Sequence, residues 1–185
     1  YQLERQIISI LLKYGAEEIS FEDSLLSKDN KGKVIETKKE IKSKVFEKIY
    51  LDLQQDEIEF THSPFKDIYH KLIHGFHHQK TLSIDNFIND LDSGSSKIIS
   101  YILINDEKYQ LHDWERKNIY VKKIGSELSQ LVNETILNMR RFLIDKKIKE
   151  LQQFENENDK NDILEQVMHY YSLKKMLSAK LNRVV

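Results

Sequence analysis

Apolar residues between positions 127 and 154 recur with a helical period, but they change sides of the helix halfway along. The first half carries one apolar stripe, made of Leu128, Leu131, Val132, Met139, Phe142 and Leu143. The second half carries an opposite stripe, made of Leu137, Ile144, Ile148 and Leu151. Residues spaced by three and four lie on one face of a helix, so the pattern predicts a long helix that packs with two different partners.

A second helical run covers residues 163–184 and follows a polar break at residues 155–162. Its apolar residues alternate at spacings of four and three, with members Ile163, Val167, Tyr170, Leu177, Leu181 and Val184. We expect this run to pack against the second apolar stripe of the long helix. We therefore expect the chain to fold back here into an antiparallel helical hairpin.

The preceding sequence predicts further helices over residues 3–14, 37–53, 65–76, 84–91 and 98–103. Gly15 is expected as a left-handed helix cap, Ser63-Pro64 as a helix start, and Ser83 as an N-cap. The run Tyr101–Ile104 would also suit a buried strand, but i, i+4 pairing among Ile98, Ile99, Ile102 and Leu103 favours a helix capped by Ser95 or Ser96.

The remaining segments give weaker signals. Residues 16–36 contain Asn30 and Gly32 and are expected to form an irregular loop, and no pair of strands is predicted anywhere. Residues 28–48 contain eight lysines together with four acidic residues, which indicates a solvated loop leading into a helix. The aromatic residues of segment 108–121, Tyr109, Trp114 and Tyr120, are expected to pack on the bundle.

The predicted fold class is therefore all-α. We expect a helical bundle subdomain over residues 1–136 and a C-terminal antiparallel helical hairpin over residues 137–185, with the helix 127–154 shared between them. The 185 residues include one proline and five glycines, so few positions force a helix to end.

The amino-acid composition disfavours several classes of function. The formal net charge of -1 disfavours nucleic acid as the main ligand. The absence of cysteine removes disulfides, thiolate metal sites and cysteine nucleophiles, and it suggests a reducing, cytoplasmic compartment. No apolar run approaches the roughly 20 residues that span a bilayer. Because the chain begins at Tyr1 within a helical pattern, we interpret it as a fragment of a longer polypeptide.

Histidines give the first candidate chemistry, since His70, His74, His77 and His78 fall on one predicted helix. His70 and His74 have the i, i+4 spacing of a shared metal site, but Lys71 stands where the H-E-x-x-H motif needs glutamate. We interpret these residues as exposed helix histidines. Asp90-Leu91-Asp92 could bind a metal, but it is interpreted as a helix terminus.

An alternative enzyme hypothesis rests on His112-Asp113. All-helical HD-type phosphohydrolases bind metal through such a pair, with an upstream histidine and a downstream aspartate, roles that His78 and Asp145 would take. Little else around the pair matches that family. Phosphate-binding loops and nucleophile elbows are absent from the sequence.

The last helix offers a surface for a protein partner. Met168, Tyr171, Leu173 and Met176 lie partly off its packing stripe, near four cations, Lys174, Lys175, Lys180 and Arg183. Apolar side chains next to mobile cations suit a helix-mediated protein contact.

Three segments also resemble the C-terminal region of bacterial replicative DNA primases of the DnaG type. They are YQLERQIISILLKYG at the start, DEKYQLHDWERKNIYV in the centre, and the ending from ETILNMRRFLIDKKIKELQ to YYSLKKMLSAKLNRVV. The resemblance covers essentially the whole chain. The lysine-rich stretch 28–44 is a departure, because it has no counterpart that we can place.

The resemblance implies a helical bundle with a terminal hairpin that docks on the N-terminal domain of the hexameric replicative helicase. It implies no catalysis by this fragment; zinc and magnesium would be needed only by the missing zinc-binding and polymerase domains of the primase. By position, we expect the partner contact at Tyr171, Lys174, Lys175, Leu177, Lys180, Leu181 and Arg183, with Leu177 and Leu181 mainly structural. An alternative that keeps the fold is the N-terminal domain of a replicative helicase.

Overall fold

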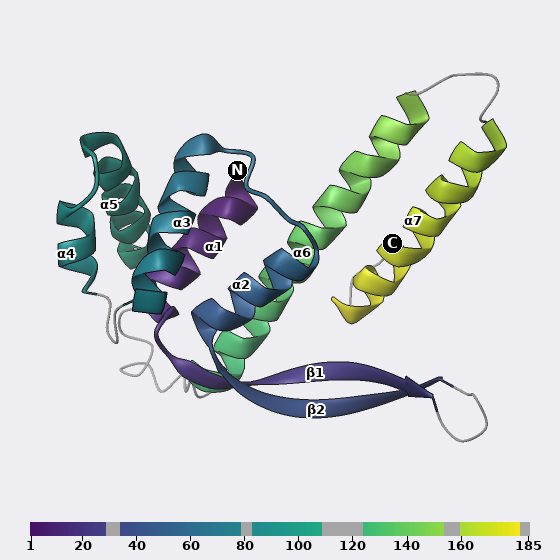
Figure 1. Cartoon of the computed structure of the whole chain (residues 1–185), viewed down its shortest axis with the longest axis horizontal. Helices are drawn as coiled ribbons and strands as arrows, with labels where there is room; N and C mark the ends of the chain where they lie inside the picture. The colour runs from purple at the N-terminus through teal and green to yellow at the C-terminus, as the bar shows by residue number, and fades with distance from the viewer. Residues whose placement is uncertain (29–33, 79–82, 109–123, 154–159, 182–185) are drawn as a thin grey trace. The chain divides into compact units, whose positions relative to one another are not determined.

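The computed structural model describes residues 1–28, 34–78, 83–108, 124–153 and 160–181, and it is mainly helical (Figure 1). This part of the chain has seven helices and one two-stranded sheet. In chain order the elements are α1 (Gln2–Tyr14), β1 (Glu18–Lys28), β2 (Val34–Lys44), α2 (Val45–Gln55), α3 (Ser63–His78), α4 (Ile84–Asn89), α5 (Ser93–Lys108), α6 (Ile124–Gln153) and α7 (Lys160–Lys180). The all-α prediction is confirmed, with a β-hairpin added.

Contacts divide the chain into two compact units, Tyr1–Val132 and Asn133–Val185. The division falls inside α6, which is continuous from Ile124 to Gln153. Among the described helices, none combines the length and the apolar character that crossing a membrane requires.

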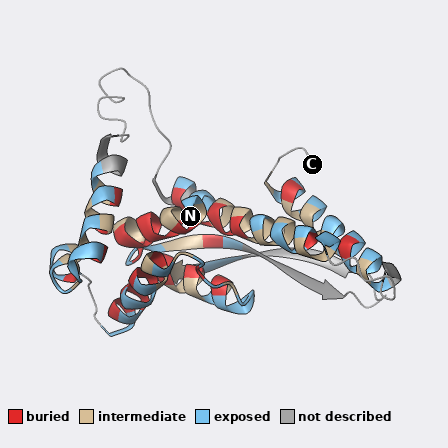
Figure 2. Ribbon diagram, turned by 90° about the horizontal axis from the view of Figure 1, so that it is seen from above, coloured by how far each residue is buried: buried red, intermediate tan, exposed pale blue. Residues whose placement is uncertain are grey.

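Helix α1 is the centre of the first unit. Residues 7–12 are all buried, and α1 contacts α2, α3 and α5. This stretch reads Ile-Ile-Ser-Ile-Leu-Leu, and apart from Ser9 it is apolar around most of the helix, so neighbouring elements must cover it. Burial colouring shows this concentration of buried residues near the N-terminus (Figure 2).

A buried carboxylate connects the start of α1 to the loop that precedes α3. Glu4 is only 3% exposed, and its Oε1 accepts hydrogen bonds from the Thr61 amide at 2.5 Å and from the Thr61 hydroxyl at 2.9 Å. Burial raises the pKa of Glu4, but the hydrogen bonds from Thr61 and from the His62 amide outweigh burial and hold the pKa below its usual value. The charged form of Glu4 is therefore the one that fits this site.

Gly15 does not have the left-handed conformation that we predicted. Its φ is -54° and its ψ is -37°, which any residue can adopt. A Cβ at this position would overlap the Phe76 ring and the Leu11 carbonyl oxygen. Glycine is needed here because α3 approaches the end of α1 closely, and not because of backbone strain.

The prediction of an irregular loop over residues 16–36 and of a helix from about residue 37 was wrong. β1 and β2 pair antiparallel in a continuous ladder from Glu18 opposite Lys44 to Lys28 opposite Val34, and α2 begins only at Val45. Phe21 faces Ile41 in this ladder and is almost completely buried. Two backbone hydrogen bonds close the end of the β-hairpin where it joins α1 and α2. The Val45 amide donates to the Glu17 carbonyl, and the Phe46 amide donates to the Gly15 carbonyl.

The other helix predictions are largely confirmed. Residues 98–103 are helical within α5, but the predicted cap was wrong: Asp92, and not Ser95 or Ser96, accepts hydrogen bonds from the Gly94 and Ser95 amides, each at 2.9 Å. Ser83 occupies the N-cap position of α4 without a capping hydrogen bond from its side chain. Tyr109, Trp114 and Tyr120 lie outside the described residues.

Candidate protein-interaction surface

Helices α6 and α7 run antiparallel as a hairpin in the second unit (Figure 1). Val167 and Ser178 are buried on α7, and Ile148 is buried on α6. The Lys174 ammonium lies 2.7 Å from the Asp145 carboxylate, which joins the two helices halfway along the hairpin. The helical repeat of residues 163–181 therefore packs one face of α7, as the 4,3 spacing predicted.

The burial of α6 differs from the predicted stripes at three residues, Leu131, Ile136 and Phe142. Leu128, Val132 and Met139 are buried as expected, and Ile136, which was not assigned to the first stripe, is buried with them. Leu131 and Phe142 were assigned to that stripe but are 37% and 55% exposed. Ile148 is buried on the opposite side of the helix, so the change of face is present but occurs before Phe142.

The outer face of α7 exposes large apolar side chains. We call this set the outer stripe: Leu164, Met168, Tyr171 and Met176, which are 58%, 66%, 48% and 54% exposed. Because each residue advances about 100° around a helix, Leu164, Met168 and Tyr171 border the face that contains Val167 and Ser178, whereas Met176 lies on the opposite side of the helix. Figure 2 shows α7 mainly in the colours of exposed and intermediate residues.

The structure places the expected contact residues in two groups. Tyr171, Lys175 and Lys180 are exposed on α7, whereas Lys174, Leu177 and Leu181 are partly buried. Arg183 lies outside the described residues. Lys174 also forms the ion pair with Asp145. The exposed group can contact a partner directly, and the partly buried group supports the hairpin.

Leu164 was missed as a surface residue by sequence reasoning. The signal was present, because Leu164, Met168 and Tyr171 follow the spacing i, i+4, i+7 on their own. In the sequence alone, a second apolar stripe on a helix is interpreted as another packing face. The structure shows that the stripe with Val167 is covered and that Leu164, Met168 and Tyr171 stay exposed.

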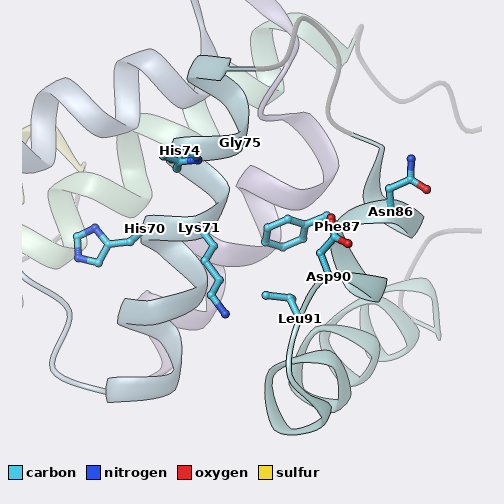
Figure 3. Close-up of a pocket in the computed structure, with 8 residues that line it drawn as sticks. All are labelled: His70, Lys71, His74, Gly75, Asn86, Phe87, Asp90 and Leu91. Carbon is cyan, nitrogen blue, oxygen red and sulfur yellow. The ribbon is translucent and has the colours of Figure 1, made fainter.

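Three residues that suggested metal chemistry line one open cleft in the first unit (Figure 3). His70 and His74 come from α3, and Asp90 follows α4. The cleft has a volume of about 430 Å³ and is also lined by Lys71, Gly75, Asn86, Phe87 and Leu91. In Figure 3 His70 points away from Asp90, and the described residues contain no group of three or more side chains placed to hold a metal ion.

Near this cleft, Asp92 has a structural role. Hydrogen bonds from Ser95 and Gly94 hold the pKa of the Asp92 carboxyl below its usual value, and the Lys71 ammonium lies 3.9 Å away. The interpretation of Asp90-Leu91-Asp92 as a helix terminus is confirmed for Asp92, which caps α5.

The residues of the phosphohydrolase hypothesis are only partly described. His112 and Asp113 lie outside the described residues. The Asp145 carboxylate, which would be the downstream ligand, is paired with Lys174. The His78 Nδ1 lies 2.9 Å from the His74 carbonyl oxygen, within its own helix.

No curated protein matches this sequence, and no solved structure matches it. A family model does match, over residues 1–184. The chain therefore belongs to the family described as domain of unknown function DUF8430.

Proposed function

We propose that this chain is a non-catalytic protein-interaction domain, the helicase-binding domain of a bacterial DNA primase. In this proposal it acts in the cytoplasm, docks on the N-terminal domain of the hexameric replicative helicase, and brings RNA-primer synthesis to the replication fork. The fragment itself needs no cofactor and makes no strong contact with nucleic acid or membrane. The resemblance of its three segments to DnaG-type primases supports the choice of partner.

The outer stripe of α7 is the observation that carries the proposal. Four large apolar side chains lie about half exposed or more on one helix of 21 residues. Apolar patches of this kind, bordered by polar residues, mark surfaces that bind other proteins. Tyrosine and methionine are also enriched in such surfaces, because they add contact area and adapt to the partner's shape.

The charge of α7 predicts the chemistry of the partner. From Val167 to the end of the chain there are three lysines and one arginine and no acidic residue. Lys175 and Lys180 are exposed next to the outer stripe. The partner surface should therefore have an apolar groove bordered by carboxylates near the C-terminal end of α7.

Isothermal titration of the 185-residue chain with the N-terminal domain of the cognate helicase tests the proposal. We expect binding with a dissociation constant in or below the range of tens of micromolar. Tyr171→Ala should weaken it by roughly tenfold or more, since exposed aromatic side chains often dominate such contacts. The matched control is Tyr101→Ala on α5, because Tyr101 is 62% exposed in the other unit.

Absence of binding at these concentrations, with the circular dichroism of a folded helical protein, would contradict the proposal. Equal losses for Tyr171→Ala and Tyr101→Ala would instead contradict the placement of the contact on α7.

A further inference from the structure

Three exposed histidines stand in one row along α3. His70, His74 and His78 follow one another at a spacing of four residues, and the side chains of all three are exposed. Positions four apart lie one above the other on a helix. The row therefore contains two pairs with the spacing of a shared metal site, His70 with His74 and His74 with His78. The sequence does not distinguish between these two pairs.

Ring contacts in the structure distinguish them. The His74 and His78 rings are stacked, with their centroids 4.0 Å apart and an angle of 19° between the ring planes. The His70 ring instead contacts its neighbour Tyr69, at 5.6 Å and 64°, and in Figure 3 it points away from the His74 ring. The geometry thus favours His74 and His78 as the pair that can share a ligand.

A hydrogen bond orients the His78 ring in the way that metal binding requires. The His78 Nδ1 lies 2.9 Å from the His74 carbonyl oxygen. A carbonyl oxygen can only accept, so Nδ1 carries the proton and Nε2 of the neutral ring keeps its lone pair. Metal-binding histidines typically donate their second ring nitrogen to a carbonyl or a carboxylate, which fixes the tautomer and the ring orientation.

The separation of the two rings suits one bridging ion. A metal ion binds an imidazole nitrogen at about 2.1 Å, so two nitrogens that share an ion lie no more than about 4 Å apart. The 4.0 Å between the ring centroids is compatible with this limit. The described residues contain no cluster of three such ligands, so we infer a site of two imidazoles with water as the further ligands.

We propose that His74 and His78 form a chelating pair for a divalent transition-metal ion at the C-terminal end of α3. Imidazole ligands suit Cu²⁺, Ni²⁺ and Zn²⁺, and Cu²⁺ binds most tightly in this series. The ion links two successive turns of the helix and stabilises the last turn of α3, where Phe76 stacks on Phe46. The proposal does not rest on the proposed function, because docking on the helicase uses α7.

Isothermal titration of the untagged 185-residue chain with Cu²⁺, Ni²⁺ and Zn²⁺ tests the pair. We expect Cu²⁺ to bind most tightly, with a dissociation constant in or below the range of tens of micromolar. His74→Gln and His78→Gln should each weaken Cu²⁺ binding by about tenfold or more, because the second imidazole no longer adds to the first. His70→Gln is the matched control on the same helix and should leave binding unchanged.

Thermal unfolding followed by circular dichroism gives a second measurement. An ion that binds the aligned pair in the folded helix should raise the Tm of the wild type and of His70→Gln. The same concentration of Cu²⁺ should change the Tm of His74→Gln and His78→Gln much less. Circular dichroism without metal confirms that each variant has the helix content of the wild type.

A wild type that does not bind Cu²⁺ at about 100 µM would overturn the proposal. Undiminished binding by His78→Gln would overturn it as well, and equal losses for His70→Gln and His78→Gln would reject the choice of the pair. The helicase titration is run in metal-free buffer, so failure of the metal site and failure of helicase docking are separate results.

Discussion

Helices α3 and α7 use their apolar residues in opposite ways. Of the 16 residues of α3, seven are buried, with Phe65, Ile68 and Leu72 at 1% exposure or less. On α7, with 21 residues, Val167 and Ser178 are buried, while Leu164, Met168, Tyr171 and Met176 remain exposed. Both helices have apolar residues at helical spacing, so spacing alone does not distinguish a helix that builds a core from one that offers a surface.

The difference follows from how many neighbours surround each helix. α3 contacts both α1 and α2, which together cover a broad face. Within its own unit, α7 faces one described helix, α6, and a single neighbour covers only one narrow stripe. The remaining large apolar side chains of α7, Leu164, Met168, Tyr171 and Met176, therefore stay exposed.

A matched pair of leucine truncations should show the comparison most strongly. Leu72→Ala removes a fully buried side chain on α3, and Leu164→Ala removes a side chain on α7 that is 58% exposed. We expect Leu72→Ala to lower the free energy of unfolding by about 3 kcal/mol, through lost burial and the cavity left behind. Leu164→Ala should change it by less than about 0.5 kcal/mol.

Urea unfolding followed by circular dichroism measures both values. Similar losses for the two variants would show that Leu164 is enclosed in the folded chain, and the contrast between the helices would then disappear.

The close approach of α3 to α1 gives the next largest effect. Gly15→Ala adds a methyl group that would overlap the Phe76 ring, and we expect a loss of about 2 kcal/mol. Gly94→Ala is the control, because its Cβ would meet only the Asp92 Oδ1, at 3.1 Å. Thermal unfolding should show a clear fall in Tm for the first variant and little change for the second.

Adding Phe76→Leu to Gly15→Ala should recover part of the loss, since the smaller side chain makes room for the methyl group. Equal thermal stability of Gly15→Ala and the wild type would show that the helices can separate without cost.

A smaller effect is expected from Glu4, which fixes the loop before α3. Its pKa is lowered in the folded state, so its charged form stabilises the fold above the unfolded-state pKa, and this contribution is lost as the pH falls through the folded-state value. Glu4→Gln should cost about 1 to 2 kcal/mol at pH 7, because the hydrogen bonds from Thr61 then reach a neutral group.

Stability measured from pH 7 down to pH 3 tests the sign. The gap between wild type and Glu4→Gln should narrow as the solution becomes acidic, since only the wild type loses the contribution of this carboxylate. A gap that stays constant or widens would contradict the role of the Glu4 charge.

The smallest effect concerns the ion pair of the hairpin. Lys174 and Asp145 are both partly exposed to solvent, and a pair of this kind contributes about 0.5 kcal/mol. A double-mutant cycle with Lys174→Ala and Asp145→Ala should give a coupling energy of that size, which falls at high salt. A coupling above about 2 kcal/mol would show that α7 is held as firmly as α3.

Much of the fold could be predicted from local patterns, because the helices depend on residues close in sequence. The extents of α1, α3 and α6 follow from apolar spacing, and the position of α4 follows from Ser83. The β-hairpin could not be predicted in this way. Ile41 stands at i, i+4 spacing from Val45 and so favours a helix locally, whereas the strand depends on pairing with β1, a separate segment that places the buried Phe21 opposite Ile41.

The candidate surface on α7 could likewise be predicted only in part. The sequence by itself determined that α7 has apolar residues at helical spacing, that its C-terminal half is basic, and that Tyr171 and its neighbouring lysines suit a protein contact. The tertiary structure decided which side of α7 faces α6, and thereby that Lys174 is bound to Asp145 while Leu164, Met168 and Met176 remain exposed. Side-chain spacing defines the faces of a helix, but only the neighbouring elements determine which face is covered.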